Sequence, residues 1–205
     1  IVVIGFCDQD YMYLRNHMRI PFVVYDGYCE KPERILNITI DNYDGGFQTG
    51  TYFRERGHKR ALCIADNDIC VDMERYQGFR DGFASGMVEF VMIPMRKEER
   101  WEYYRRNLSM FQSITAVFAV SDYYAMDLIC FLQEQGIRVP EQISVAGFDD
   151  IPMCRMFCPT LTTVKQDGAL RAKIAVETLR ELKEGKPIQN EIRLPVSLVV
   201  RSSTK

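Results

Sequence analysis

The sequence predicts an α/β protein in which parallel strands form a sheet with helices on both faces. The composition fits an ordinary globular protein, with 47% hydrophobic and 26% charged residues in a chain of 205. Short apolar runs rich in β-branched residues alternate along the chain with segments that have helical periodicity. Most of these runs are almost unbroken in apolar character, which is typical of strands buried on both faces of a parallel sheet.

The expected strands are short and lie between turn-forming or polar residues. Strand and helix in repetition imply right-handed crossovers, and therefore a doubly wound sheet. The strands are expected at Ile1–Gly5, Phe22–Tyr25, Ile38–Ile40, Ala61–Ala65, Glu89–Ile93, Ala116–Val120, Ile143–Phe148, Leu161–Val164 and Val196–Val200.

Three segments have the marks of helices with defined ends. Each is followed by a glycine, which adopts the left-handed conformation of a helix end at little cost. Ser121 and Asp122 are both good N-cap types for the second helix. The segments are Asp44–Arg56, Asp122–Gln135 and Asp167–Glu184, followed by Gly57, Gly136 and Gly185.

Charge, hydropathy and cysteine content exclude several classes of protein. A net charge of −2 excludes a broadly basic surface for phosphate backbones, and no apolar run is long enough to span a membrane. The seven cysteines are odd in number, and several lie in apolar runs, such as Cys7, Cys63 and Cys130. This favours free thiols in a reducing compartment, so we expect a cytoplasmic protein. The first residues resemble a strand that begins abruptly, without the features of a signal peptide.

Polar residues gather where the expected strands end. In open α/β sheets, ligands bind outside the carboxyl ends of the strands, so this edge is the predicted ligand site. Asp122 also fits a helix cap and Asp150 a turn former, while Asp26, Asp41 and Asp149 fit either ligand contact or loop chemistry. The residues at these ends are Asp26, Asp41, Ser121, Asp122, Asp149 and Asp150.

Catalytic and metal-binding patterns are absent from the sequence. Asp44-Gly45-Gly46 is too short for a phosphate-binding loop, and no nucleophile elbow occurs. His17 and His58 are far apart, and His58 fits a structural role in a helix-to-strand turn. The spacing of Cys154 and Cys158 differs from that of a zinc knuckle. We therefore expect neither an enzyme nor a bound metal or cofactor.

Several ordered motifs resemble one family, the LacI/GalR-type bacterial transcription regulators, in their effector-binding core. The resemblance extends from the first residue to the last, and it is specific because the motifs agree in order and spacing. They are IDNYDGG at 40–46, RGHKR at 56–60, RYQGF at 75–79, TAVFAVSD at 115–122, GIRVPE at 136–141, VAGFDD at 145–150, PTLTTVKQD at 159–167 and LPVSLVVR at 194–201.

The resemblance implies two Rossmann-like subdomains of the type I periplasmic-binding-protein kind. Residues 1–41 with 167–194 would form an incomplete N-terminal subdomain, and 42–166 with 195–205 the C-terminal one. A small polar metabolite such as a sugar would bind in the cleft between them. The helix-turn-helix headpiece and the first part of the core are expected upstream, so operator DNA would be bound only through the absent headpiece.

The family's effector contacts fall on polar and aromatic residues here. The fork of Arg75 suits two ligand oxygens, Asp149 would accept from hydroxyl or amine donors, and Phe118 and Trp101 would cover a ring. Alternatively, Arg75 pairs internally with Asp149 or Asp26. Ser121 stands where many sugar-binding members have asparagine, which argues against a standard hexopyranose. The implied contacts are Asp26, Asp41, Arg75, Trp101, Phe118, Ser121, Asp149 and Gln166.

The family also implies a homodimer that relays effector binding to DNA binding, as a repressor does. Met126 and Ile129 fit either the dimer interface or the core, whereas apolar residues around 153–157 favour a partner surface. A periplasmic sugar-binding receptor shares the fold and is the alternative function. A third possibility is a fragment without function that aggregates through exposed strand edges. The implied interface residues are Met126, Ile129, Met153, Met156 and Phe157.

Overall fold

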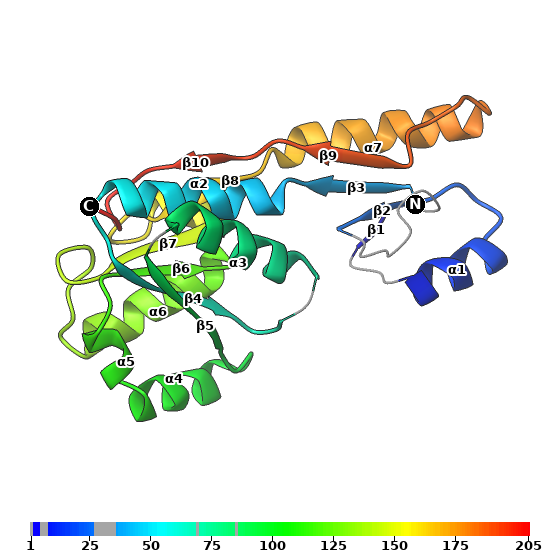
Figure 1. Ribbon diagram of the computed structural model, residues 1–205. Helices are drawn as coiled ribbons and strands as arrows, with labels where there is room; N and C mark the ends of the chain where they lie inside the picture. The colour runs from blue at the N-terminus through cyan, green and yellow to red at the C-terminus, as the bar shows by residue number, and fades with distance from the viewer. Residues whose placement is uncertain (1, 5–7, 27–35, 69, 85) are drawn as a thin grey trace. The chain divides into compact units, whose positions relative to one another are not determined.

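A computed structural model describes residues 2–4, 8–26, 36–68, 70–84 and 86–205. The chain divides into two compact units (Figure 1). Unit 1 comprises Ile1–Asp41 and Asp167–Pro195, and unit 2 comprises Asn42–Gln166 and Val196–Lys205. The structure confirms the predicted α/β fold class with parallel sheets.

Unit 1 contains a four-stranded parallel sheet in the order β1-β2-β3-β9. Its central strands β2 and β3 are mostly buried, although β3 includes the polar residues Asn37 and Thr39, and β9 alternates in burial. The expected strand Ile1–Gly5 extends in part beyond the described residues. The elements are β1 (Val2–Ile4), α1 (Asp8–His17), β2 (Val23–Tyr25), β3 (Asn37–Ile40), α7 (Gly168–Lys183) and β9 (Glu191–Leu194).

Unit 2 contains a six-stranded sheet in the order β10-β8-β7-β6-β4-β5. All neighbouring strands are parallel except β10, which lies antiparallel to β8 at the edge. The strands are β4 (Arg60–Ala65), β5 (Met87–Met92), β6 (Ala116–Ala119), β7 (Ser144–Asp149), β8 (Thr162–Lys165) and β10 (Ser197–Val199). The helices are α2 (Asn42–Glu55), α3 (Cys70–Phe83), α4 (Lys97–Arg106), α5 (Ser109–Gln112), α6 (Asp122–Glu134) and the 3-10 turn η2 (Pro152–Arg155).

Helices cover both faces of the unit 2 sheet (Figure 1). On one face, Phe79 of α3 packs against Phe53 of α2 and Phe118 of β6. On the other face, residues of α4, α5 and α6 form a buried cluster with Val117 and Ala119 of β6. Every residue of β6 is buried, which explains why this strand has no polar alternation in the sequence.

Helices α2 and α3 approach each other so closely that only glycine fits at their crossing. A side chain at Gly46 would meet the backbone carbonyl of Arg75, and one at Gly78 would meet the carbonyl of Tyr43. Because the two backbones touch here, the N-terminal end of α2 lies beside the turn of α3 that carries Arg75. This crossing therefore places two parts of the candidate site together.

Candidate functional site

The N-terminus of α6 is fixed by two adjacent residues with different roles. Ser121 is the N-cap, and its Oγ accepts a hydrogen bond from the Tyr124 backbone N–H at 3.4 Å. Asp122, which was also a cap candidate in the sequence, instead accepts hydrogen bonds from groups outside its own helix. Its fully buried carboxylate accepts from the Ile151 N–H at 2.9 Å and from Thr163 Oγ1. Asp122 thus ties β8 and η2 to α6, and it serves the scaffold rather than a ligand.

The thiol of Cys154 belongs to the same buried group. Its Sγ lies 3.0 Å from Asp122 Oδ2 and donates to it. Burial and this carboxylate raise the pKa of Cys154, so the thiol stays protonated. Burial also raises the pKa of Asp122, while its hydrogen bonds act in the opposite direction. Of the cysteines expected as free thiols in apolar runs, Cys63 is free and buried, Cys130 is free and half-buried, and Cys7 lies outside the described residues.

The carboxyl ends of β7 and β8 bring two predicted contacts together. Gln166 Nε2 donates to Asp149 Oδ1 at 2.7 Å. The backbone at Asp149 and Asp150 has φ values of 123° and 55°, in the left-handed region that non-glycine residues seldom occupy. Such strain often accompanies functional sites, because the surrounding structure must hold it in place.

Arg75 lies beside this edge and is held by several contacts. Its guanidinium stacks on the Phe148 ring, 3.8 Å from the centroid. Nε donates to Asn42 Oδ1 at 2.9 Å, and Nη1 donates to the Val120 carbonyl at 2.6 Å. Arg75 is only 8% exposed, so its orientation is set by the protein before any ligand binds.

A group of polar side chains at the carboxyl end of β4 was missed in the sequence. Asn67 Nδ2 donates to Asp72 Oδ2 at 2.8 Å and to Asp66 Oδ1 at 3.3 Å. Burial raises the pKa of Asp72, while Arg75 and Asn67 oppose that shift. Burial and a hydrogen bond to Asp66 raise the pKa of the Tyr124 phenol. The rule used at the other strands would have found Asp66, since it directly follows β4.

This edge of unit 2 therefore combines one preorganised cation with several hydrogen-bond acceptors. Asp66, Asp72 and Asp149 contribute carboxylates, and Gln166 contributes an amide. Carboxylates accept hydrogen bonds from hydroxyl and amine groups, and Arg75 donates. The arrangement suits a ligand that is rich in donors.

In unit 1, Asp26 forms an ion pair. Its Oδ1 lies 2.7 Å from Arg171 Nη2, and the Arg171 guanidinium stacks on the Tyr25 ring at 4.2 Å. Thr39 Oγ1 also donates to Asp26 at 3.4 Å. Asp26 has φ 49°, so this strand end is strained in the same way as Asp149. Asp41 follows β3, and its N–H donates to the Leu194 carbonyl at 2.9 Å.

The two aromatic residues predicted to cover a ligand ring, Phe118 and Trp101, contact other parts of unit 2. Phe118 is fully buried, with its ring 5.0 Å from that of Phe79, so the protein itself covers both ring faces. Trp101 lies on α4, and its Nε1–H donates to Asp127 Oδ1 at 3.0 Å, against α6. The structure therefore groups neither aromatic side chain with Arg75. The ring beside Arg75 is Phe148.

The predicted dimer residues separate into core and surface. Ile129 is fully buried in the core of unit 2, so it has no surface to offer a partner; the core alternative holds. Met126 and Phe157 are partly buried against the same core. Met153 and Met156 are exposed, at 50% and 72%, and leave an apolar surface around η2.

Within the residues that the structure describes, no three His, Cys, Asp or Glu side chains are grouped in a way that could hold a metal ion. None of the helices described combines the length and apolar character needed to cross a bilayer.

Comparison with known proteins identifies similar sequences. Residues 51–204 match the periplasmic binding protein-like domain family. The HTH-type transcriptional repressor PurR of Vibrio atlanticus is 33% identical over 202 residues, and that of Mannheimia succiniciproducens is 30% identical over 200. Each alignment covers 94% of this chain and 59% of the relative. The chain thus spans about three fifths of the length of these relatives.

Solved structures share the fold. A complex of the transcriptional regulator CelR with cellobiose has a TM-score of 0.84 and 26% identity, covering 98% of this chain and 64% of that one. A dimeric Lac repressor with a C-terminal deletion has a TM-score of 0.85 and 25% identity, covering 99% and 76%.

Proposed function

The chain belongs to the periplasmic binding protein-like family, and we propose that it is the effector-sensing core of a LacI-type transcriptional repressor. The PurR relatives, named as repressors, favour this function over that of a periplasmic sugar receptor. The proposal includes a cytoplasmic location and no catalytic activity. DNA would be bound by a headpiece that is not among these residues.

The observation that carries the proposal is the preorganised edge of unit 2. Arg75 is held by Asn42, Phe148 and Val120, and Asp149 is held by Gln166. Buried, already oriented polar groups at the carboxyl ends of parallel strands are what a small-molecule site requires. Asp26 and Asp41 of unit 1 remain further contacts, as the family resemblance implies.

The effector is a small polar metabolite rich in hydrogen-bond donors, such as a sugar. The CelR neighbour binds cellobiose, which supports the sugar class. Three carboxylates near one arginine favour hydroxyl or amine donors over an anion, since like charges repel. Ser121 offers one hydroxyl where an asparagine amide could bond two adjacent hydroxyls, so a ligand other than a standard hexopyranose is expected.

The assembly is a homodimer in which the exposed surface around η2 contacts a second copy. Met153 and Met156 supply the apolar part of that surface. The dimeric Lac repressor neighbour is consistent with this. Effector binding would favour one conformation of the dimer, and the headpieces would report the change.

A thermal-shift screen tests the proposed function. The panel holds sugars including ribose and cellobiose, their phosphates, nucleosides and amino acids, and Trp101 fluorescence follows unfolding of unit 2. A ligand at 100 times its Kd adds about 2.7 kcal/mol, which raises the Tm by about 5–10 °C. We expect a neutral sugar to raise the Tm more than its phosphate does. A panel in which no compound raises the Tm, or in which only phosphates do, would contradict the proposal.

A further inference from the structure

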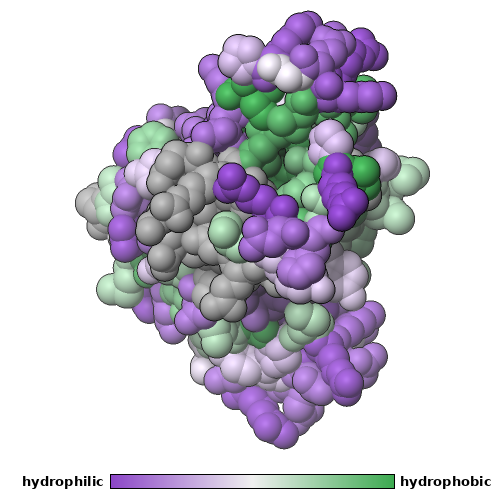
Figure 2. All heavy atoms as spheres, turned by 90° about the vertical axis from the view of Figure 1, so that its right-hand side faces the viewer, coloured by the Kyte–Doolittle hydropathy of each residue, from purple (hydrophilic) through white to green (hydrophobic). Residues whose placement is uncertain are grey.

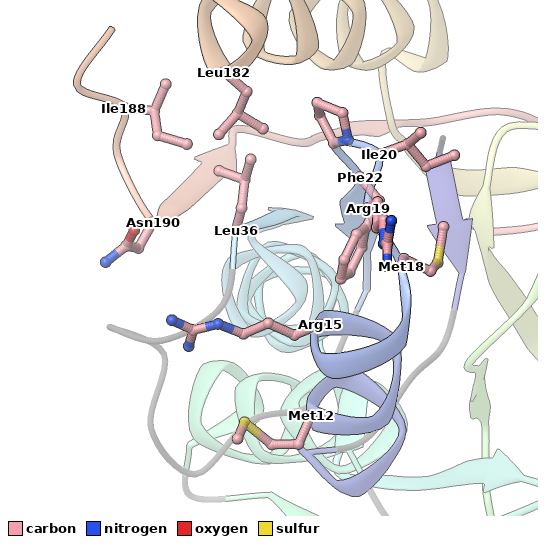
Figure 3. A pocket seen from close by; sticks show the side chains of 11 residues that line it. Met12, Arg15, Met18, Arg19, Ile20, Phe22, Leu36, Leu182, Ile188 and Asn190 are labelled. Carbon is pink, nitrogen blue, oxygen red and sulfur yellow. The ribbon is translucent and has the colours of Figure 1, made fainter. Parts of the chain in front are cut away.

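Unit 1 contains a cavity of about 780 Å³ at the amino ends of its strands. Its floor includes Phe22, which precedes β2, and Leu36, which precedes β3. One wall comes from α1 and the loop after it, and the other from Leu182 of α7 and Ile188 (Figure 3). The carboxyl-end residues Asp26 and Asp41 lie at the opposite ends of these strands, so this cavity is separate from the proposed effector contacts.

The lining is mainly apolar. Met12 and Ile20 are 41% and 52% exposed, whereas Leu36 is buried. Figure 2, turned so that the right-hand side of Figure 1 faces the viewer, shows apolar side chains gathered beside hydrophilic ones. A hollow of this size is in the range of small-molecule sites, which are mostly apolar with a few polar groups.

Among the lining residues that the structure describes, the charged groups are all basic. These are Arg15 and Arg19, and none of the described lining residues is acidic. Within the described part of the chain, neither arginine makes an ion pair. The Arg15 side chain extends from α1 toward the side of the cavity where Asn190 lies (Figure 3). A guanidinium without an internal carboxylate is available to bind an external one.

We infer that this cavity binds a small organic anion with an apolar body, such as an aryl-alkyl carboxylate. The apolar body lies against Phe22, Leu36 and Leu182, and Arg15 and Arg19 pair with the carboxylate. The inference does not rest on the proposed function, because it concerns a different set of residues in unit 1. It gives the protein a second ligand class, distinct from a donor-rich effector.

Isothermal titration with 4-phenylbutyrate tests the inference, with 4-phenylbutanol as the uncharged match. The acid should bind saturably and at least tenfold more tightly than the alcohol. The double variant Arg15→Gln, Arg19→Gln should lose this preference. The control Arg180→Gln changes an exposed arginine of α7 that does not line the cavity, and it should retain the preference.

Further variants locate the bound probe. Leu36→Ala should weaken the binding of both compounds, because it removes apolar contact. Circular dichroism checks that the variant is folded. Arg75→Ala, in unit 2, should leave both affinities unchanged. Equal affinity for the acid and the alcohol, or loss of binding in Arg75→Ala, would each overturn the inference.

Discussion

Arg75 is the residue on which the proposed site depends most. Its planar guanidinium is fixed between the Phe148 ring, Asn42 Oδ1 and the Val120 carbonyl. A donor held in this way loses little conformational entropy when a ligand arrives. The hydrogen-bond acceptors of the site are carboxylates and an amide. Donors of the ligand can therefore bond to these groups, and acceptors of the ligand can bond to Arg75.

Replacing Arg75 by alanine should weaken the best ligand of the screen about tenfold to a hundredfold. An unpaired buried ligand oxygen costs about 1–3 kcal/mol, which corresponds to that range. The matched control is Arg80→Ala, since Arg80 lies on the same helix, is exposed and pairs with Asp81. Affinity measured by calorimetry should be unchanged in the control. Unchanged affinity in Arg75→Ala would remove this residue from the site.

His58 should make unit 2 sensitive to mild acid. Burial lowers the pKa of its imidazole below the value of about 6.5 that the unfolded chain has. As the pH falls below 6.5, the unfolded state binds the proton first, so the free energy of unfolding decreases. The urea midpoint, followed by Trp101 fluorescence, should fall between pH 7.5 and pH 5.5.

The variant His58→Asn separates this effect from other titrations. Asparagine retains a partner for Thr115, which contacts His58 Nδ1 at 2.8 Å, and it does not titrate. The variant should show a smaller fall of the midpoint, whereas His17→Asn, which changes an exposed histidine of unit 1, should behave like the wild type. The same pH dependence in all three proteins would contradict the assignment.

At single positions, the sequence predicted residue types better than their roles. Asp149 was a candidate from its place at a strand end and Gln166 only through the family resemblance, and the structure shows the two side chains hydrogen-bonded. Of the two adjacent N-cap types, Ser121 is the cap and Asp122 bonds to Ile151 instead, because a cap depends on backbone geometry that a pair of adjacent N-cap types does not reveal. Trp101 stays a prediction as a ring contact, and its hydrogen bond to Asp127 could not be foreseen because Asp127 is on another helix.

At the scale of elements, the crossing of α2 and α3 positions the site. Glycines on both helices let the backbones touch, and this contact places Asn42, the first residue of α2, within reach of Arg75 on α3. Any side chain at the crossing would force the helices apart. The site is therefore coupled to helix packing rather than to loop conformation.

The substitution Gly78→Ala should destabilise unit 2 by about 1–3 kcal/mol, the usual range for overpacking. The added methyl would collide with the Tyr43 carbonyl, and the displaced helix would also weaken ligand binding. Urea unfolding followed by Trp101 fluorescence measures the first effect, and calorimetry the second. Gly168→Ala is the control, since open space surrounds that position in unit 1. A variant as stable as the control would refute the packing argument.

The strands and helices with strong apolar patterns were predicted well, and edge elements were not. The observed strand β6, Ala116–Ala119, nearly coincides with the apolar run Ala116–Val120 that predicted it. Strand β10 lies antiparallel at the sheet edge, which a local pattern cannot distinguish from parallel pairing. Strand β9 was missed because only Leu194 of its four residues is buried. Pairing partners decide such elements, and these are distant in sequence.

At the scale of the whole molecule, the two units hold different candidate binding groups. Unit 2 holds Arg75, Asp149 and Gln166, while unit 1 holds the Asp26–Arg171 ion pair and the basic, apolar cavity. The family match covers residues 51–204, which include most of unit 2. Each unit forms its own sheet.

The assembly prediction concerns the surface around η2. The double variant Met153→Lys, Met156→Lys should shift the sedimentation profile from dimer to monomer, because buried charge at an interface is unfavourable. Met92→Lys is the control, since Met92 is a similarly exposed methionine on β5. A dimer that persists in the double variant would place the interface elsewhere.

Amide hydrogen exchange with and without the best ligand of the screen tests the central claim most directly. We predict slower exchange in residues 66–75, 120–124 and 148–150, where the carboxyl ends of β4, β6 and β7 meet the ligand. Protection confined to other segments, with these three exchanging as in the free protein, would contradict it.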